Sequence, residues 1–416
     1  MDDISIKPRI RPVEAFPMRE NGQMLIVLRD PCHYSDAVLT LTPAAALTIQ
    51  MLDGTHTLLD IQAALTRAAG QIFPSDKIQE LVRILDDCFF LDNDRFDAHK
   101  RRCDDEFSAS PIRPSAMAGK SYPADPSEVR ALLDGLFAQS APSGLLSTGE
   151  NGPVVGVVSP HIDFARGGTT YTPAYRALAE SDAETYVIFG ISHAGGETPL
   201  IPTRKDFQTP LGRVEADHEI LDLLEKNLIA RDGWPRPYAA EFAHAHEHSI
   251  EFQVVFLQHL RPSRPFRILP ILCAFSHEEV HAESDRTGPI RVFLDALRVA
   301  IEQSGRRVGY IAGVDFAHVG AQFGDTYQVK EKELAFLKER DEQMMALIAS
   351  DGPEAFHRFV FEEANSRRVC GYPALYSFLS VLPPAAARGG QVLKYGQWPD
   401  PNGTVTFGSM AFSADA

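Results

Sequence analysis

Three histidines follow directly after apolar stretches that have the composition of buried strands. They are His161, His193 and His318, and the stretches are residues 154–158, 186–191 and 308–314. Parallel strands place their C-terminal ends along one edge of a sheet, where functional side chains commonly gather. A single histidine in such a place is usually structural, but three along one predicted edge indicate a functional site.

These residue types suit a metal ion. Two imidazoles and one anionic ligand, with coordination positions left open, form the ligand set of non-haem Fe(II) enzymes that activate oxygen. Cys370 and Asp163 are the two candidates for the anionic ligand. Asp163 lies two residues after His161, and residues two apart on an extended segment project to the same side. A thiolate ligand would soften the site and admit copper or zinc as well as iron.

The sequence indicates no role for the remaining histidines of the C-terminal part. His244 and His246, in the run His-Ala-His-Glu-His, are expected on the surface or in a loop. The others lie in helical or loop stretches without partners at ligand spacing; they are His218, His259, His277, His281 and His357.

The segments that must position the site alternate between strand and helix. Stretches rich in β-branched and aromatic residues predict buried strands, and stretches of helical periodicity separate them. The predicted strands are 154–158, 186–191, 266–272, 308–314, 392–395 and 404–407. The predicted helices are 174–179, 218–228, 250–260, 289–301 and 331–348. This alternation predicts a layered α/β fold with helices on both faces of one sheet.

The first 96 residues predict a separate, small winged-helix-like α+β domain. Residues 24–28 are typical of a short strand, and three amphipathic helices follow, the first opened by Thr42 and Pro43. Residues 89–91 are predicted to return as a strand. Residues 97–115 are charged, rich in serine and proline and without sustained periodicity, so we predict a linker there. The second domain is then residues 116–416.

Composition excludes several classes of partner. The net charge of −16, without a basic stripe, argues against nucleic-acid binding. The acidic start, Met1-Asp2-Asp3, is not followed by the apolar run of a signal peptide, and no stretch is apolar enough for a membrane span. Five scattered cysteines without a CxxC pair are typical of reduced thiols. We therefore expect a cytoplasmic protein.

A set of short motifs from Arg113 onward resembles the Memo family, also called protein B of the AmmeMemoRadiSam system. In chain order, the motifs are Ala118-Gly119, Tyr122-Pro123, Pro160-His161, Ser192-His193, Thr209-Pro210-Leu211-Gly212, Glu247-His248-Ser249-Ile250-Glu251, Asp315-Phe316-x-His318-x-Gly320 and Cys370-Gly371. The match covers roughly 300 residues and keeps the family's order. Memo domains resemble class III extradiol dioxygenases in fold.

The resemblance implies roles for particular residues. Its metal ligands would be His161, His193 and Cys370, and Asp163 would be a candidate fourth ligand. The supporting or acid–base groups would be His318, His248 and Asp315. Two positions depart from the family pattern: Ile162-Asp163-Phe164 stands where Ala-Gly-Tyr is usual, and Tyr372 stands where arginine is usual. The pocket thus gains a carboxylate at Asp163 and loses a cation at Tyr372, which implies a substrate different from that of other family members.

The N-terminal domain resembles PqqD-like modules, which hold a precursor peptide for a modifying enzyme. The resemblance rests on Leu52-Asp53-Gly54 with Thr57, Leu58 and Ile61. It implies a peptide partner, added as a strand at the edge 24–28. A DNA-binding winged helix would need a basic recognition helix, but the third predicted helix carries Asp76, Glu80, Asp86 and Asp87 against Lys77 and Arg83.

Three functions follow as hypotheses. The leading one is a non-haem metal-dependent oxidoreductase of the dioxygenase type, most simply with Fe(II), that acts on a peptide or a small aromatic substrate. The second is a non-catalytic metal-binding adaptor that captures a peptide through its N-terminal domain. The third is a zinc-dependent hydrolase that activates water.

Overall fold

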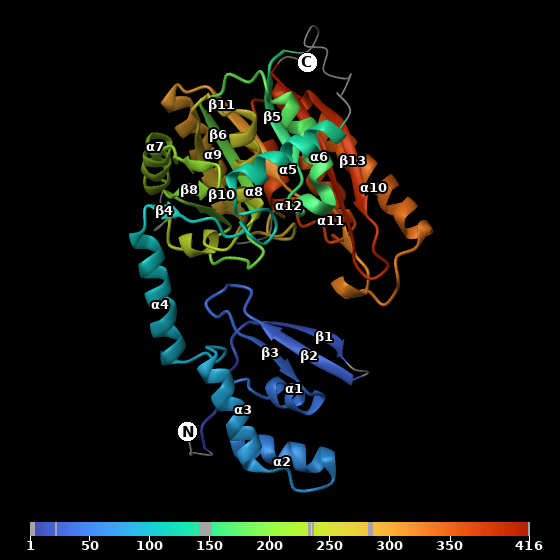
Figure 1. The fold of residues 1–416 in the computed structure, drawn as a ribbon. Coiled ribbons are helices and arrows are strands. Elements are labelled where there is room, and N and C mark those ends of the chain that lie inside the picture. The colour runs from blue at the N-terminus through green and yellow to red at the C-terminus, as the bar shows by residue number, and fades with distance from the viewer. Residues whose placement is uncertain are drawn as a thin grey trace. The chain divides into compact units, whose positions relative to one another are not determined.

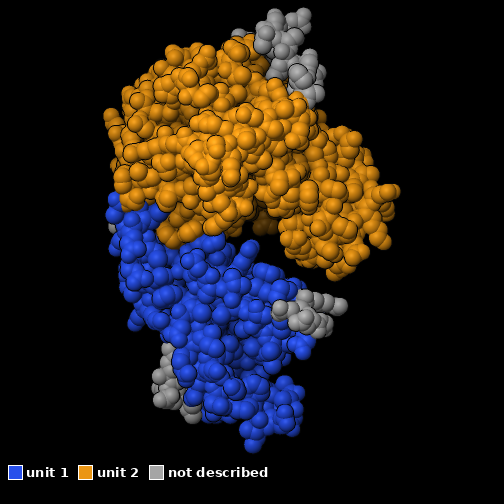
Figure 2. All heavy atoms as spheres, in the orientation of Figure 1, with its two compact units in different colours: residues 1–109 blue, residues 110–416 orange. Residues whose placement is uncertain are grey.

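The computed structural model describes residues 5–20, 23–140, 152–231, 234, 237–281 and 286–414. The acidic start of the chain, Met1-Asp2-Asp3, lies outside these ranges. The chain divides into two compact units, residues 1–109 (unit 1) and residues 110–416 (unit 2), which Figure 2 shows in separate colours. The unit boundary falls inside the predicted linker. Each unit has its own hydrophobic core.

Unit 1 begins with a three-stranded antiparallel sheet. Its strands are β1 (Glu14–Glu20), β2 (Gln23–Arg29) and β3 (Val38–Leu41), and β2 lies between the other two. The expected edge strand at 24–28 was therefore assigned wrongly, because β1 and β3 pair with both sides of this segment. The sequence pattern shows that β2 is a strand, but not which segments pair with it.

Three helices pack on this sheet: α1 (Pro43–Gln50), α2 (Leu58–Ala69) and α3 (Ser75–Asp87). The predicted cap at Thr42 is present, since its hydroxyl accepts from the amide of Ala45. Thr57 and Asp60 form a capping box on α2. The predicted returning strand at 89–91 is reduced to one bridge, Leu91 with Ile10. In this small α+β domain the three strands of the sheet therefore precede the helices in the chain, and the expected fourth strand after the helices is only a single bridge.

The predicted linker is largely helical. Residues 97–109 belong to α4 (Asp94–Ala109), which has no buried residue among its sixteen. A helix without a buried face lacks the apolar periodicity on which the sequence prediction depends. Helix α4 is stabilised instead by ion pairs between side chains one turn apart, Lys100 with Asp104 and Arg102 with Glu106.

Unit 2 is built on one large mixed sheet with four parallel strands at its centre (Figure 1). In spatial order these are β5 (Val154–Ser159), β11 (Val308–Gly313), β6 (Thr185–Ile191) and β10 (Arg267–Cys273). Antiparallel strands extend the sheet on both sides. On one side β7 (Leu200–Pro202) pairs with β10. On the other side β14 (Thr404–Ser413) pairs with β5, and β12 (His318–Val319) and β13 (Gly390–Trp398) pair with β14. All six predicted strands are present.

Helices cover both faces of this sheet, as predicted. One face packs on α5 (Pro126–Gln139), α6 (Phe164–Ala177) and α8 (Ser249–Leu260). The other packs on α7 (His218–Ile229), α9 (Thr287–Ser304), α10 (Glu331–Ser350), α11 (Gly352–Glu362) and α12 (Tyr372–Val381). The strands divide between the two cores residue by residue, as in β6, where Val187 and Phe189 face one core and Tyr186 and Ile188 the other. This explains why the strands have continuous apolar runs.

Smaller elements complete unit 2. A second sheet joins β4 (Ile112–Arg113), β8 (Asp206–Thr209) and β9 (Gly212–Val214). Three short 3-10 helices are η1 (Glu241–His244), η2 (Ala321–Phe323) and η3 (Ala386–Arg388). Helix α6 begins ten residues before the predicted 174, because Asp163 caps it and Gly168 lets Leu136 of α5 pack closely. None of the helices in the described ranges is both long and apolar enough to cross a lipid bilayer.

Candidate metal centre

The loops after the parallel strands β5, β6 and β11 meet at one edge of the sheet. His161 follows β5 and is 2% exposed. Asp315, which follows β11, accepts hydrogen bonds through Oδ1 from the main-chain amides of His161 (3.0 Å) and Ile162 (3.2 Å). The His161 ring is fixed from the same strand, because its Nδ1 lies 2.9 Å from the carbonyl oxygen of Gly313. The predicted role of Asp315 as a supporting group fits this geometry.

The segment Glu247–Glu251 brings helix α8 to the end of β6. The Ser249 hydroxyl accepts from the amide of Ile191 (3.0 Å) and donates to its carbonyl (3.1 Å), which ties the first turn of α8 to the strand. Gly190 makes room, since a Cβ there would lie 2.5 Å from that hydroxyl. His193 and His248 are thereby placed on either side of Glu247.

Glu247 holds both of these rings. Its carboxylate lies 3.0 Å from Nδ1 of His193 and 3.1 Å from Nδ1 of His248. It also accepts from the main-chain amides of His193 (3.1 Å), His248 (2.7 Å) and Ser249 (3.1 Å). A carboxylate bonded to Nδ1 fixes a ring's tautomer and orientation and leaves Nε2 for another partner.

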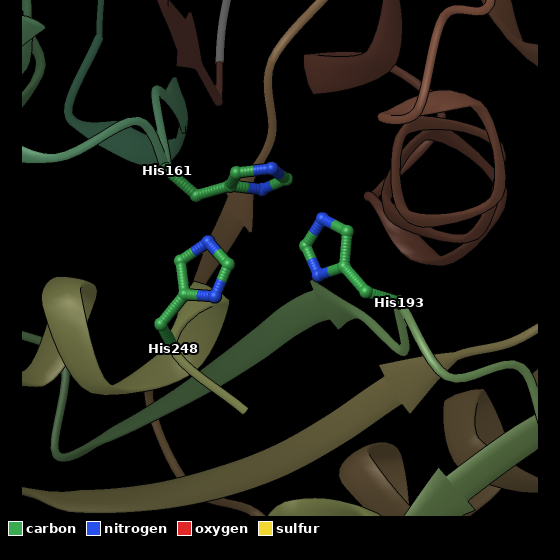
Figure 3. A group of neighbouring side chains, drawn as sticks. All are labelled: His161, His193 and His248. Atoms are coloured by element: carbon green, nitrogen blue, oxygen red, sulfur yellow. The ribbon is translucent and has the colours of Figure 1, made fainter. Parts of the chain in front are cut away.

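His161, His193 and His248 form a group that is able to hold a metal ion. One ring nitrogen of each lies within 4.8 Å of the other two, and Figure 3 shows the rings pointing toward one another. Since Nδ1 of every ring already has an oxygen partner, the Nε2 atoms would be the ligand atoms of a bound metal. Three neutral imidazoles with bonded Nδ1 atoms are a common ligand set for first-row transition metals. The donor set of this chain therefore fits a metal ion.

Cys370 lies beside this group. Its Sγ is 3.5 Å from Nε2 of His161 and 3.7 Å from the carbonyl oxygen of Asp315. Gly371 allows this approach, because a Cβ there would lie 2.5 Å from the same carbonyl. The predicted ligands His161, His193 and Cys370 are thus brought together, and His248, predicted as an acid–base group, belongs to the group of three histidines that could hold a metal ion.

Asp163 has a different place. The segment bends at Ile162 and enters helix α6, so the extended geometry that would align Asp163 with His161 is lost. Asp163 is the N-cap of α6, accepts from the amide of Arg166 at 3.0 Å, and forms an ion pair with the Arg166 side chain. Its carboxylate is not part of the three-histidine group.

His318 lies close to Cys370, with which it interacts electrostatically. Its Nδ1 lies 3.1 Å from the carbonyl oxygen of Phe316, and its amide donates to the carbonyl of Arg367. Arg368 donates to the carbonyl of His318 and pairs with Asp325, which ties this strand to the loop that carries Cys370. His318 is therefore a neighbour of the group rather than a member of it.

The side chains of the site influence one another's charge. Burial opposes the Cys370 thiolate, but the neighbouring His318 and His161 outweigh it and lower the pKa of Cys370 well below its usual value. Burial also opposes a charged His161, yet Asp315 and Cys370 raise its pKa to about 9. Desolvation would raise the pKa of Glu247, but His193 and His248 lower it well below the usual value. Because a metal needs deprotonated ligands, binding would release protons.

A cavity of about 390 Å³ opens next to the site. Its lining includes His193 and Cys370, and also Ile191 and Cys273, the last residues of β6 and β10. His193 keeps 42% of its side-chain surface exposed. A small molecule therefore has access to the group from this side.

Sequence reasoning missed two features. Glu247 was noticed only as part of a motif, although its position between two histidines was a usable signal for a carboxylate that orients them. His244 was expected on the surface or in a loop. It is 1% exposed in η1, and its Nε2 lies 2.8 Å from the carbonyl oxygen of Ile201, so burial lowers its pKa to about 4.

Comparisons with known proteins cover both units. A family model described as "Memo-like protein" matches residues 113–407. A MEMO1 family protein of Aquifex aeolicus is 25% identical over 412 residues, covering 98% of this chain and 100% of the relative. That alignment is longer than unit 2, so it includes unit 1 as well.

Archaeal relatives match a shorter part of the chain. A MEMO1 family protein of Methanococcoides burtonii is 30% identical over 292 residues, which is 70% of this chain and 95% of the relative. One of Methanopyrus kandleri is 30% identical over 295 residues, again 70% of this chain and 94% of the relative. The family match spans nearly all of unit 2 and includes His161, His193, His248 and Cys370. The chain belongs to the Memo family.

Proposed function

We propose that this protein is a metal-dependent oxidoreductase of the non-haem iron type. One observation carries the proposal: the Nδ1 atoms of His161, His193 and His248 all have oxygen partners, so their Nε2 atoms converge beside a cysteine and next to an open cavity. A purely structural histidine cluster has no need of three fixed tautomers that point at one place.

The three imidazoles would hold the metal, with the Cys370 thiolate as a further ligand. A bound Fe(II) ion would supply the redox chemistry, with dioxygen as co-reactant. Copper and zinc also accept imidazole and thiolate ligands. The carboxylate of Glu247 and the carbonyl of Gly313 hold the rings in the tautomer that carries the proton on Nδ1 and leaves Nε2 free for the metal.

His318 provides the proton chemistry. Burial disfavours a charged His318, but the thiolate of Cys370 and the carboxylate of Asp315 raise its pKa. A histidine with a raised pKa beside the reacting atoms is suited to donate a proton during turnover. Asp315 holds the main chain of His161 and stabilises the charge on His318, so it positions residues and is not the proton donor.

Two rival functions differ in how they would use the same residues. An adaptor would bind its metal in a closed site with no exchangeable position. A zinc-dependent hydrolase would need an open position but no redox metal. The cavity at His193 favours an open site over the closed one.

Metal analysis of protein purified without air tests the proposal. We expect about one first-row metal ion per chain, with iron dominant, and loss of the metal in His161→Ala, His193→Ala and His248→Ala. His218→Ala is the matched control, since His218 is exposed on α7 and lies outside the three-histidine group. Full metal occupancy in the first three variants would contradict the site.

Nitric oxide, a stand-in for dioxygen, then probes the open positions. We expect an EPR-active adduct with the iron-loaded protein. A tightly bound iron that forms no adduct would support the adaptor, and a zinc-only protein with metal-dependent cleavage activity would support the hydrolase.

A further inference from the structure

The loop that carries Cys370, between α11 and α12, contains the main backbone strain of unit 2. Ala364, Asn365 and Arg368 have φ angles of 48°, 44° and 50°, in the left-handed region that residues with a Cβ normally avoid. The other non-glycine residues with positive φ in the described ranges, His33 and Phe89, belong to unit 1. Such strain persists only where the surrounding structure holds it, and it is common at functional sites.

Two of the three strained residues are explained by the end of α11. The amide of Ala364 donates to the carbonyl of Phe361 (2.9 Å) and that of Asn365 to the carbonyl of Val360 (3.0 Å), which is the Schellman pattern of a helix C-terminus. Asparagine also tolerates the left-handed region well. Arg368 has neither reason, since it lies beyond the helix end and has a long side chain.

The side chain of Arg368 makes the contacts that hold its own main chain. Its Nη2 donates to Oδ1 of Asp325 at 2.8 Å and its Nη1 to Oδ2 at 3.0 Å. The Asp325 carboxylate is itself fixed, because it accepts from the amide of Gly320 at 2.8 Å. Partly exposed ion pairs generally contribute little, but a bidentate arginine–carboxylate pair is the exception. This pair therefore offsets the cost of the left-handed conformation.

The loop is also attached to the main chain of His318. The His318 amide donates to the carbonyl of Arg367 at 2.8 Å, and the His318 carbonyl accepts from Nη1 of Arg368 at 3.2 Å. Arg367 in turn forms a buried ion pair with Asp341 of α10. The chain is thus fixed just before residue 368.

The chain is fixed again just after Cys370. The amide of Gly371 donates to the carbonyl of Asp315 at 3.1 Å. Because both ends of this short segment are held, the backbone conformation at Arg368 decides where Cys370 points. In this conformation its Sγ lies 3.5 Å from Nε2 of His161. A relaxation of residue 368 to a negative φ would rotate the following peptide unit and turn the thiol away.

We propose that Arg368 is a positioning residue of the metal centre: its bidentate pair with Asp325 keeps residue 368 in the left-handed conformation, which directs the Cys370 thiol toward the imidazoles. Arg368 acts through the loop and not at the metal. The inference deepens the proposed function and rests on it only for the role of Cys370 as a ligand.

Co(II) added to the metal-free, full-length protein tests the proposal, because thiolate coordination gives Co(II) a charge-transfer band in the near ultraviolet. Arg368→Ala keeps the backbone strain and loses the ion pair. Arg368→Gly also loses the pair, but glycine adopts the left-handed conformation without strain. We expect Arg368→Ala to bind Co(II) about ten-fold more weakly than the wild type, with most of the thiolate band lost. Arg368→Gly should bind about five-fold or more tighter than Arg368→Ala and regain the band.

This order of the two variants separates positioning from a purely stabilising ion pair. If the pair only stabilised the fold, glycine would do no better than alanine, since it loses more conformational entropy on folding. Asp325→Asn should resemble Arg368→Ala. Ala364→Gly is the matched control, because it relieves strain at the end of α11 and leaves the ion pair intact. Its thiolate band should equal that of the wild type.

Hydrogen exchange of the loop in the metal-free protein gives a readout that needs no metal. The amide of Val369, which donates to Oδ1 of Asn365 at 2.8 Å, should exchange about ten-fold faster in Arg368→Ala and Asp325→Asn. Unchanged exchange in both variants, or Co(II) binding by Arg368→Gly no tighter than by Arg368→Ala, would overturn the inference. A wild type that binds Co(II) without a thiolate band would instead remove Cys370 from the proposed ligands, and with it the role of Arg368 at the metal.

Discussion

Glu247 contacts His193 at two points, since its carboxylate accepts from the His193 main-chain amide and from Nδ1 of the ring. The same carboxylate holds the ring of His248. One buried side chain therefore sets the direction of two of the three imidazoles. The third, His161, depends instead on Gly313 and Asp315.

Replacing Glu247 with glutamine should weaken metal binding without removing a ligand. The amide keeps the size of the side chain but loses the charge that orders both Nδ1–H groups, and such changes typically weaken metal affinity about 10- to 100-fold. Competition with a chelator measures the loss. Glu197→Gln is the control, since Glu197 is exposed on the loop after β6. Unchanged chelator sensitivity in Glu247→Gln would remove Glu247 from this role.

His318→Gln should retain the metal and lose turnover. His318 lies outside the three-histidine group, and a glutamine cannot carry the proton that a histidine with a raised pKa donates. We expect near-normal metal content and a rate of substrate-dependent O2 uptake reduced about 100-fold or more. Loss of the metal in this variant would instead make His318 a ligand.

Glu251→Gln should destabilise unit 2 strongly. Glu251 forms an ion pair with Arg113, both side chains have 0% exposure, and Glu251 also accepts from Ser115 at 2.7 Å. Removing the carboxylate charge leaves Arg113 buried without compensation, which costs about 3–5 kcal/mol. Urea unfolding followed by tryptophan fluorescence measures this in unit 2, because both tryptophans, Trp234 and Trp398, belong to it. Glu184→Gln, from an exposed pair with Arg307, should cost less than about 1 kcal/mol.

The same pair predicts a pH dependence. Burial would raise the pKa of Glu251, but Arg113 and Tyr122 outweigh it and lower the folded-state pKa. The unfolded chain then binds the proton more readily, so the pair stabilises unit 2 fully above the unfolded pKa of about 4.3. This contribution is lost as the pH falls from there toward the folded-state pKa. The stability difference between the wild type and Glu251→Gln should therefore shrink as the pH is lowered below about 4.3; a difference that stays constant would contradict the assignment.

Removing unit 1 should leave the metal centre intact. Unit 2 has two hydrophobic cores of its own. The relative from Methanococcoides burtonii, which aligns with 292 residues of this chain, is covered over 95% of its own length. We expect residues 110–416 to bind the same amount of metal per chain as the full protein. Loss of metal binding in a folded fragment would mean that the site needs unit 1.

Peptide capture by unit 1 is tested with the same fragment. A peptide that adds as a strand must pair with β1 or β3, because β2 already has neighbours on both sides. Tethering raises the local concentration of a captured substrate, so its removal should weaken the apparent affinity for a peptide substrate. An unchanged apparent affinity would leave unit 1 without that role.

The amino-acid sequence by itself determined the strands of unit 2 and the histidines after them. Strands buried on both faces have continuous apolar runs, which remain recognisable without a structure, and parallel strands leave their C-terminal loops at one edge. His161 and His193 were identified in this way, whereas Cys370 was one of two candidate anionic ligands and was singled out by the family motifs. Helix α4 was missed because it has no buried face, and the position of Asp163 at the N-cap of α6 was not foreseen because a bend at Ile162 replaces the extended chain.

Only the tertiary structure decided which distant residues meet. His248 reaches the metal group because Ser249 ties α8 to β6, and Glu247 holds two rings because their loops come together there. His277 and Asn365 share a cavity although 88 positions separate them in the chain. Such contacts depend on the packing of whole elements, whereas a sequence pattern reports only the periodicity within one element.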